Sequence, residues 1–164
     1  MGEPNSQPNG KFGMMVGDPL MGNLTALIPG ARGYPVQYPA SVNMEKDNTK
    51  GSLDIINRLV KQTSACPSQK FALVGYSQGA VVVRLAAAEI PVEIIPKILA
   101  VVVYGDPTIV GDPMAMGPVP ARKMSDELYK RLQENCSKGD FTCDTSPGCH
   151  SDLNRHMDLS LIHI

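Results

Sequence analysis

The sequence has no tryptophan, few aromatic residues and no stretch of charges of one sign. Aromatic residues make up 5% of the 164 positions, and 15 Lys+Arg stand against 16 Asp+Glu, which gives a formal net charge of -1. Nucleic-acid binding depends on a basic surface that neutralises phosphates, and this composition offers none. We therefore expect no nucleic-acid partner.

Long hydrophobic runs are also missing. The apolar run that begins at Ala80 is broken by Arg84, and the run 98–104 is far shorter than the roughly 20 residues that a membrane-spanning helix needs. Residues 1–13 carry Pro, Asn, Gly and Gln where a signal peptide would need an apolar segment. The sequence therefore predicts no membrane partner, and no signal peptide is visible in it.

Motifs for common cofactors are absent as well. The sequence contains no phosphate-binding loop and no flavin or nicotinamide fingerprint. Glycine-rich segments such as 10–17 lack the preceding strand that a dinucleotide site requires. We expect no cofactor.

Cysteine is scarce for a disulfide scaffold, yet four residues are many for a cytosolic protein of this length. Three lie in the last third of the chain, Cys136, Cys143 and Cys149, which favours a secreted, extracellular protein. The rival interpretation is a zinc site that adds His150 as fourth ligand. Gaps of six and five residues are irregular, whereas structural zinc sites favour closely spaced ligand pairs, so zinc is the weaker hypothesis.

The sequence does contain strand patterns that alternate with helical patterns, in a length that suits one domain, residues 1–164. Strands are expected over residues 33–38, 70–75 and 98–104. Helices are expected from an Asp18 cap to a stop at Pro29, and over 50–65, 80–89 and 125–135. This alternation predicts an α/β fold, a three-layer sandwich with a central parallel sheet.

Two of these helices carry more specific expectations. The helix over 50–65 places five residues on one side, which we expect to pack on the sheet: Leu53, Ile56, Leu59, Val60 and Thr63. Ser125 is expected to cap the helix that runs to Asn135.

The chemistry concentrates at Gly75-Tyr76-Ser77-Gln78-Gly79, which matches GxSxG between a predicted strand and a predicted helix. A serine in such a strained turn projects its hydroxyl above the sheet edge, and the glycines avoid collisions with neighbouring backbone. The backbone N–H of Gln78, at the start of the helix, is placed to hydrogen-bond an oxyanion. The alternative is a turn with chance glycines, which the flanking strand and helix disfavour.

The elbow residues 75–79 resemble the GYSQG segment of the cutinase family, and Cys66 lies eleven positions before Ser77, as in that family. Residues 136–143 resemble the family's disulfide-closed CxxGDxxC loop, whose aspartate is the acid of the catalytic triad. The segment 156–159 is the nearest match to the HLxY-like setting of the family's histidine.

These motifs follow the order Ser, Asp, His over residues 66–159, and residues 18–40 also look family-like. The resemblance implies an α/β-hydrolase-like serine esterase that hydrolyses carboxylic esters. Its triad would consist of Ser77 as nucleophile, His156 as base and Asp140 as the acid that orients the imidazole.

Other residues could fill these roles. Asp140 could be an ordinary solvated turn aspartate, and Asp106 is a rival acid because it follows the strand 98–104. The motif Gly-Asp-Pro occurs three times, however, which points to turn chemistry at Asp106. His150 and His163 also follow Asp140, so sequence order alone permits either as the base.

The resemblance also predicts what this chain lacks. In the family, the partner of the cysteine that matches Cys66 comes from an N-terminal strand, which also delivers a second oxyanion donor. We expect a chain truncated at both ends, without that first strand and the C-terminal helix, and therefore with weak activity, since one such donor contributes about 2.7 to 4 kcal/mol. Cys149 should not pair with Cys66, because a strand of roughly 15 to 20 Å separates their ends of the sheet.

Several readings of function stay open. The substrates that the resemblance implies are cutin, soluble short-chain acyl esters or acetylated xylan, hydrolysed by a secreted monomer. The alternatives are a catalytically inactive fragment that binds cell-wall polymer or a partner surface, and an intracellular acyl hydrolase.

Overall fold

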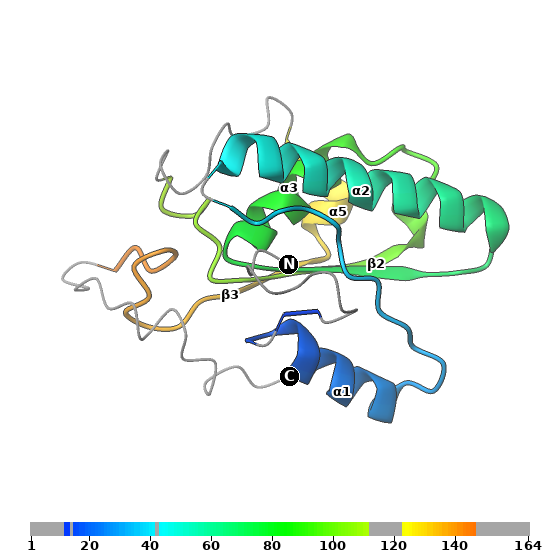
Figure 1. Cartoon of the computed structure of the whole chain (residues 1–164), viewed down its shortest axis with the longest axis horizontal. Helices are drawn as coiled ribbons and strands as arrows, with labels where there is room; N and C mark the ends of the chain where they lie inside the picture. The colour runs from blue at the N-terminus through cyan, green and yellow to red at the C-terminus, as the bar shows by residue number, and fades with distance from the viewer. Residues whose placement is uncertain (1–11, 14, 42, 112–122, 147–164) are drawn as a thin grey trace.

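The computed structural model describes residues 12–13, 15–41, 43–111 and 123–146 of the chain (Figure 1). In this part, three parallel strands form one sheet in the order β1-β2-β3. The strands are β1, Phe71–Tyr76; β2, Ile98–Tyr104; and β3, Leu132–Asn135. Helices lie on both faces of the sheet, which confirms the expected three-layer α/β architecture (Figure 1).

The strands β1 and β2 form where the sequence concentrates apolar and β-branched residues. Their register pairs Val74 with Val102 and Tyr76 with Tyr104. All three strands are parallel, so their carboxyl ends meet at the same edge of the sheet. Ligands and catalytic groups of open α/β sheets gather at such an edge.

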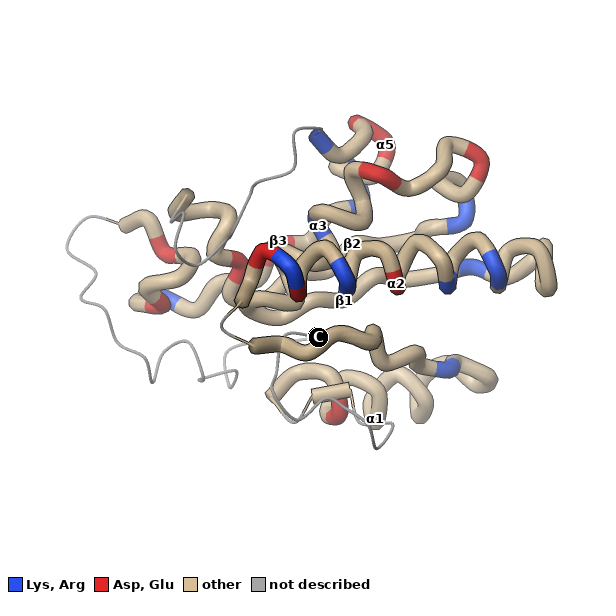
Figure 2. Tube along the Cα trace, turned by 45° about the horizontal axis from the view of Figure 1, so that its top comes forward, with Lys and Arg blue, Asp and Glu red and all other residues tan. Residues whose placement is uncertain are grey.

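Two long helices cover one face of the sheet, namely α2, Met44–Ala65, and α3, Gln78–Glu89 (Figure 1). α3 is nearly all apolar and packs into the main core with β1 and β2. A third helix, α1, Gly17–Leu27, lies on the opposite face, where Val16 contacts Tyr76 and Tyr104 (Figures 1 and 2). None of the helices in the described ranges is both long and apolar enough to cross a bilayer.

Charge is mixed along these elements. Figure 2 shows acidic and basic positions interspersed along the first half of α2, whereas the second half carries only the basic Arg58 and Lys61.

The buried face of α2 differs from the predicted one. Leu53 is 52% exposed and Val60 is also exposed, whereas the buried side consists of Asp47, Asn48, Gly51, Ser52, Ile55 and Leu59. The reason is that α2 packs chiefly against α3: a Cβ on Gly51 would lie 2.8 Å from the Val82 side chain. Close helix approach selects small residues at the contact, which a hydrophobic periodicity does not reveal.

The strand expected over 33–38 is wrong, because this segment has no regular secondary structure and is not part of the three-stranded sheet of the described residues. Asp54 on α2 holds it instead. Its carboxylate accepts hydrogen bonds from the Gln37 backbone N–H at 2.8 Å and from the Tyr34 hydroxyl at 3.1 Å.

The helix expected over 125–135 is wrong in its second half. Ser125 does cap a helix, accepting a hydrogen bond from the Leu128 N–H at 3.3 Å, but this helix, α5, covers only Asp126–Tyr129. The chain then enters β3, and the Arg131 guanidinium donates to the carbonyls of Ile95 and Ile98. Pairing with β2 overrides the helical propensity of this short segment.

The first helix also begins differently. Asp18 lies in the first turn of α1 rather than at its cap, and its carboxylate accepts a hydrogen bond from the Phe12 N–H at 2.8 Å. The predicted stop is confirmed, because α1 ends before Pro29 and Gly30 takes a φ of 86°.

Candidate active site

Ser77 occupies a sharp bend between β1 and α3, as the motif predicts. Its backbone φ of 52° and ψ of -121° lie in a region that non-glycine residues rarely adopt. The bend is fixed at both ends: the Ser77 N–H donates to the Tyr104 carbonyl at 2.9 Å, and the Ser77 carbonyl accepts from the Ala80 N–H at 2.9 Å. The serine is therefore held at the carboxyl edge of the sheet, where the first turn of α3 begins.

The bend requires a glycine at position 75. A Cβ on Gly75 would lie 2.3 Å from the Gly79 carbonyl oxygen and 2.7 Å from the Ala80 nitrogen, both of them backbone atoms. Neither atom can move without displacing the start of α3. This confirms for Gly75 the steric reason that the motif suggested.

Gln78 is the first residue of α3 and is buried. The N–H groups of a helix's first turn have no partner within the helix and favour negative charge nearby. The side-chain Nε2 of Gln78 is also buried and has no hydrogen-bond partner among the described residues. The residue after Ser77 thus brings a first-turn backbone N–H next to the serine, as predicted.

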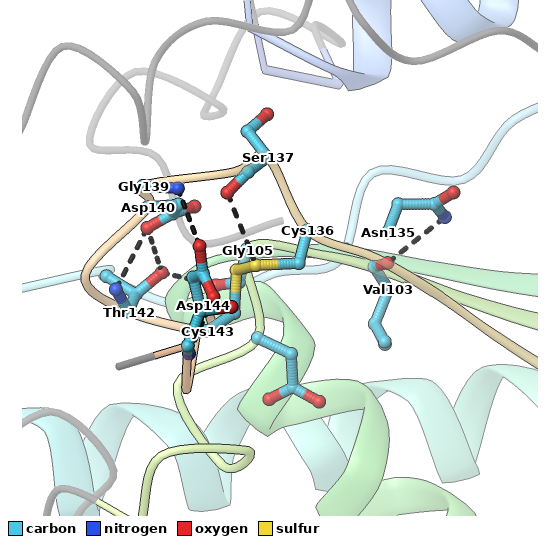
Figure 3. The surroundings of a disulfide bond; sticks show 12 residues. Val103, Gly105, Asn135, Cys136, Ser137, Gly139, Asp140, Thr142, Cys143 and Asp144 are labelled. Carbon is cyan, nitrogen blue, oxygen red and sulfur yellow. Dashed lines mark hydrogen bonds between the residues drawn. A yellow bond between two sulfur atoms is a disulfide. The ribbon is translucent and has the colours of Figure 1, made fainter. Parts of the chain in front are cut away.

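Asp140 lies in a loop that follows β3 and is closed by a disulfide between Cys136 and Cys143 (Figure 3). The carboxylate side chain is buried, with a 2% exposed fraction, although neighbouring Phe141 is 43% exposed. A solvated turn aspartate would not be buried in this way, so the structure disfavours that alternative.

The Asp140 carboxylate is held by its loop neighbour Thr142. Oδ1 of Asp140 accepts hydrogen bonds from the Thr142 backbone N–H at 2.9 Å and from the Thr142 hydroxyl at 2.7 Å (Figure 3). Both hydrogen bonds come from one residue, so Thr142 fixes the position of this carboxylate oxygen.

Asp106, the rival acid, follows β2 and has different partners. Its Oδ2 accepts from Nε of Arg84 on α3, and its Oδ1 accepts from the Thr108 N–H at 3.0 Å. A second nitrogen of the same guanidinium donates to Glu134 on β3. Both oxygens of this 1% exposed carboxylate are therefore engaged, one with Arg84 on α3 and the other with the turn that follows β2.

Two ionisable side chains around this edge have pKa values above their ordinary ones. Partial burial works against the charged guanidinium of Arg84, but the Asp106 and Glu134 carboxylates outweigh it and raise the pKa of Arg84 above its ordinary value. Burial raises the pKa of the Tyr104 phenol. Both groups therefore keep their protons throughout the neutral pH range.

The topology brings Ser77 and Asp140 to one edge of the sheet. They follow β1 and β3, which flank β2. His156, the predicted base, lies outside the described residues, as do its rivals His150 and His163.

The structure describes three of the four cysteines. Cys136 and Cys143 form the disulfide that the resemblance implied, with a sequence separation of 7, so neither offers a thiolate to the rival zinc site. Cys66 is free and exposed, whereas Cys149 lies outside the described residues.

Two residues at this edge were missed in the sequence, Thr142 and Arg84. A threonine two positions after an aspartate suits a local turn, and this signal could have drawn attention to Thr142. Nothing local marks Arg84, because its partners lie 22 and 50 positions away.

Comparisons with known proteins show similarity to cutinases and carboxylesterases. The family model described as Cutinase matches residues 5–159. The chain is 36% identical over 103 residues to "Cutinase cut1" of Trichoderma harzianum, covering 60% of this chain and 41% of that protein. It is 32% identical over 95 residues to "Carboxylesterase Culp1" of Mycobacterium tuberculosis, covering 57% and 44%. The chain thus spans less than half the length of these curated relatives.

The fold is similar to that of a solved structure, Trichoderma reesei cutinase in complex with a C11Y4 phosphonate inhibitor. The TM-score is 0.64 at 28% identity, over 87% of this chain and 60% of that one.

Proposed function

The chain belongs to the cutinase family, with its α/β-hydrolase fold, and we propose that it is a carboxylic ester hydrolase whose nucleophile is Ser77. The observation that carries the proposal is the strained bend at Ser77, with a φ of 52°, at the start of α3. A non-glycine residue in such a backbone conformation costs free energy, and residues of this kind cluster at active sites. A strained serine between a strand and a helix therefore favours a catalytic role.

The proposed reaction is acyl transfer to the serine and then to water. The Ser77 hydroxyl attacks the ester carbonyl while His156 removes its proton, and the Gln78 N–H stabilises the oxyanion. His156 then returns the proton to the departing alcohol. Water, activated by the same imidazole, hydrolyses the acyl-enzyme and regenerates Ser77.

Asp140 is the proposed acid of the triad. Its support is its place at the carboxyl edge next to β3, the disulfide that closes its loop, and its burial. Asp106 has a structural role in this proposal, because its two oxygens already bind Arg84 and Thr108. The carboxylate of Asp140 would hold the His156 imidazole in the tautomer that accepts the serine proton.

We also propose the substrate class, the oligomeric state and the localisation of the chain. The substrate is a carboxylic ester, either cutin, a short-chain acyl ester or acetylated polysaccharide, hydrolysed without a cofactor. The chain acts as a single monomeric domain over 1–164, secreted to the extracellular space. A disulfide beside the catalytic acid fits an oxidising compartment.

Hydrolysis of p-nitrophenyl acetate, butyrate and longer esters tests the proposal. Wild-type chain should hydrolyse at least one ester, and Ser77→Ala should lower the rate by about 10³-fold or more. Asp140→Asn and His156→Ala should have comparable effects, whereas His150→Ala should have little. Loss of activity in His150→Ala with normal activity in His156→Ala would reassign the base. Equal rates for wild type and Ser77→Ala would refute the nucleophile.

The ester series also separates the substrates. A preference for acetate would favour the acetylxylan esterase alternative, and a preference for butyrate or longer chains would favour cutin-type esters. A folded wild-type chain that hydrolyses none of them would favour the non-catalytic, polymer-binding alternative.

A further inference from the structure

The catalytic acid sits on a loop outside the main core, so its carboxylate needs its own fixation. The disulfide fixes the backbone of the loop at Cys136 and Cys143. Figure 3 shows that the side chain of Thr142 lies between Asp140 and Gly105.

Thr142 is nearly buried, with an 8% exposed fraction, and its hydroxyl oxygen has two acceptors within reach. The Asp140 Oδ1 lies 2.7 Å away and the Gly105 carbonyl lies 3.3 Å away. A hydroxyl has one proton, so the shorter contact, to a charged oxygen, is the stronger hydrogen bond.

The Gly105 end of this contact leads to the nucleophile. Gly105 directly follows Tyr104, whose carbonyl accepts the hydrogen bond from the Ser77 N–H, and its own N–H donates to the Asn135 carbonyl at 2.9 Å. The Thr142 hydroxyl therefore lies between the carboxylate of the acid and the backbone that anchors the serine.

We propose that Thr142 is a positioning residue that fixes the Asp140 carboxylate relative to the sheet edge that carries Ser77, an inference that rests on the proposed function. Thr142 does not touch the reacting atoms. Its hydroxyl acts by holding one carboxylate oxygen, which leaves the orientation of the carboxylate toward the imidazole defined.

Removing the hydroxyl should affect turnover more than binding. Thr142→Val keeps the shape of the side chain and the backbone N–H bond to Asp140 but loses the hydroxyl bond. Hydrogen bonds to charged groups predict a decrease in kcat of about ten- to a hundredfold. KM should stay within about twofold, because the triad acts in the transition state. Thr142→Ser restores the hydroxyl and should recover most of the loss.

The experiment measures kcat and KM on p-nitrophenyl butyrate, with active sites counted by fluorophosphonate titration. Thr145→Val is the matched control, because Thr145 is an exposed threonine of the same segment. The proposal is supported if Thr142→Val lowers kcat per active site while Thr142→Ser and Thr145→Val do not.

Three results would overturn it. Unchanged kcat in Thr142→Val refutes the positioning role alone, since the wild type remains active. Fewer titratable sites with normal kcat per site would show that Thr142 only stabilises the fold. A wild type that neither hydrolyses nor reacts with the fluorophosphonate refutes the proposed function, and this inference with it.

Discussion

The bend at Ser77 and the disulfide-closed loop of Asp140 reach the same sheet edge, but they are held in different ways. Ser77 is fixed by close-packed backbone: Gly75 against Gly79, and Ala80 fully buried at the start of α3. Asp140 is fixed by a covalent cross-link and by two hydrogen bonds from one neighbour. The bend should therefore be sensitive to added volume, and the loop to the removal of specific bonds.

Breaking the bend by volume should have the largest effect. In Gly75→Ala the new Cβ meets backbone atoms at 2.3 to 2.7 Å, and we expect a loss of more than about 3 kcal/mol in the free energy of unfolding, above the usual range for overpacking. Urea denaturation measures this loss.

Gly22→Ala is the matched control, because a Cβ there has no atom within 4 Å. It lies in α1 and should stabilise by about 0.5 to 1 kcal/mol, since alanine favours a helix interior. Equal stability of the two variants would contradict the steric account of the bend.

Arg84 joins the two regions, because its partners lie on β3 and directly after β2. Arg84→Met leaves the 1% exposed Asp106 carboxylate without its cation, and we expect a loss of about 3 kcal/mol, near the lower end for a broken buried pair. The double variant Arg84→Met/Asp106→Asn removes the stranded charge and should recover part of the stability. Thermal unfolding of both variants measures this recovery. A double variant less stable than Arg84→Met alone would argue against this explanation.

Removing the disulfide that closes the loop should have a smaller effect on stability. It should disturb the loop of Asp140 while the bend at Ser77 stays intact. Loop-closure entropy for a separation of 7 residues predicts a loss of about 2 to 3 kcal/mol in Cys136→Ser/Cys143→Ser. Circular dichroism should still show a folded core, while ester hydrolysis should fall strongly because Asp140 loses its position. Cys66→Ser, at a free and exposed thiol, serves as control and should change neither. Full activity without the disulfide would remove the contrast between loop and bend.

The smallest effect should come from the side chain next to the serine. Gln78→Met removes a buried Nε2 that has no partner among the described residues and keeps the backbone N–H proposed to bind the oxyanion, so we expect stabilisation by about 1 kcal/mol. Differential scanning calorimetry should show a higher Tm, and hydrolysis should change little. A lower Tm would mean that the amide has a role in the folded protein that its missing partner conceals.

The same contrast explains what the sequence could predict. The bend was predictable because its causes are local: a run of strand-forming residues before Gly75, an apolar helix after Ser77, and glycines at fixed positions. The parallel sheet followed from the alternation of such segments, and β1, β2 and α3 were predicted within a few residues.

The loop and the helix contacts depend on partners distant in sequence. Asp140 was predicted only through family resemblance, because no local pattern shows that a turn aspartate becomes buried. The face of α2 was misjudged because Gly51 is buried against Val82 of α3, which hydrophobic periodicity cannot reveal. The strand β3 was missed because Leu132–Asn135 lacks β-branched residues and forms through pairing with β2.

The most direct test of the account is the reaction of the folded chain with a fluorophosphonate, read by intact mass and peptide mapping. The account predicts one adduct per chain, located on Ser77, and none in Ser77→Ala. A folded wild-type chain that acquires no adduct, or acquires it on another residue, would contradict the assignment of Ser77 as nucleophile.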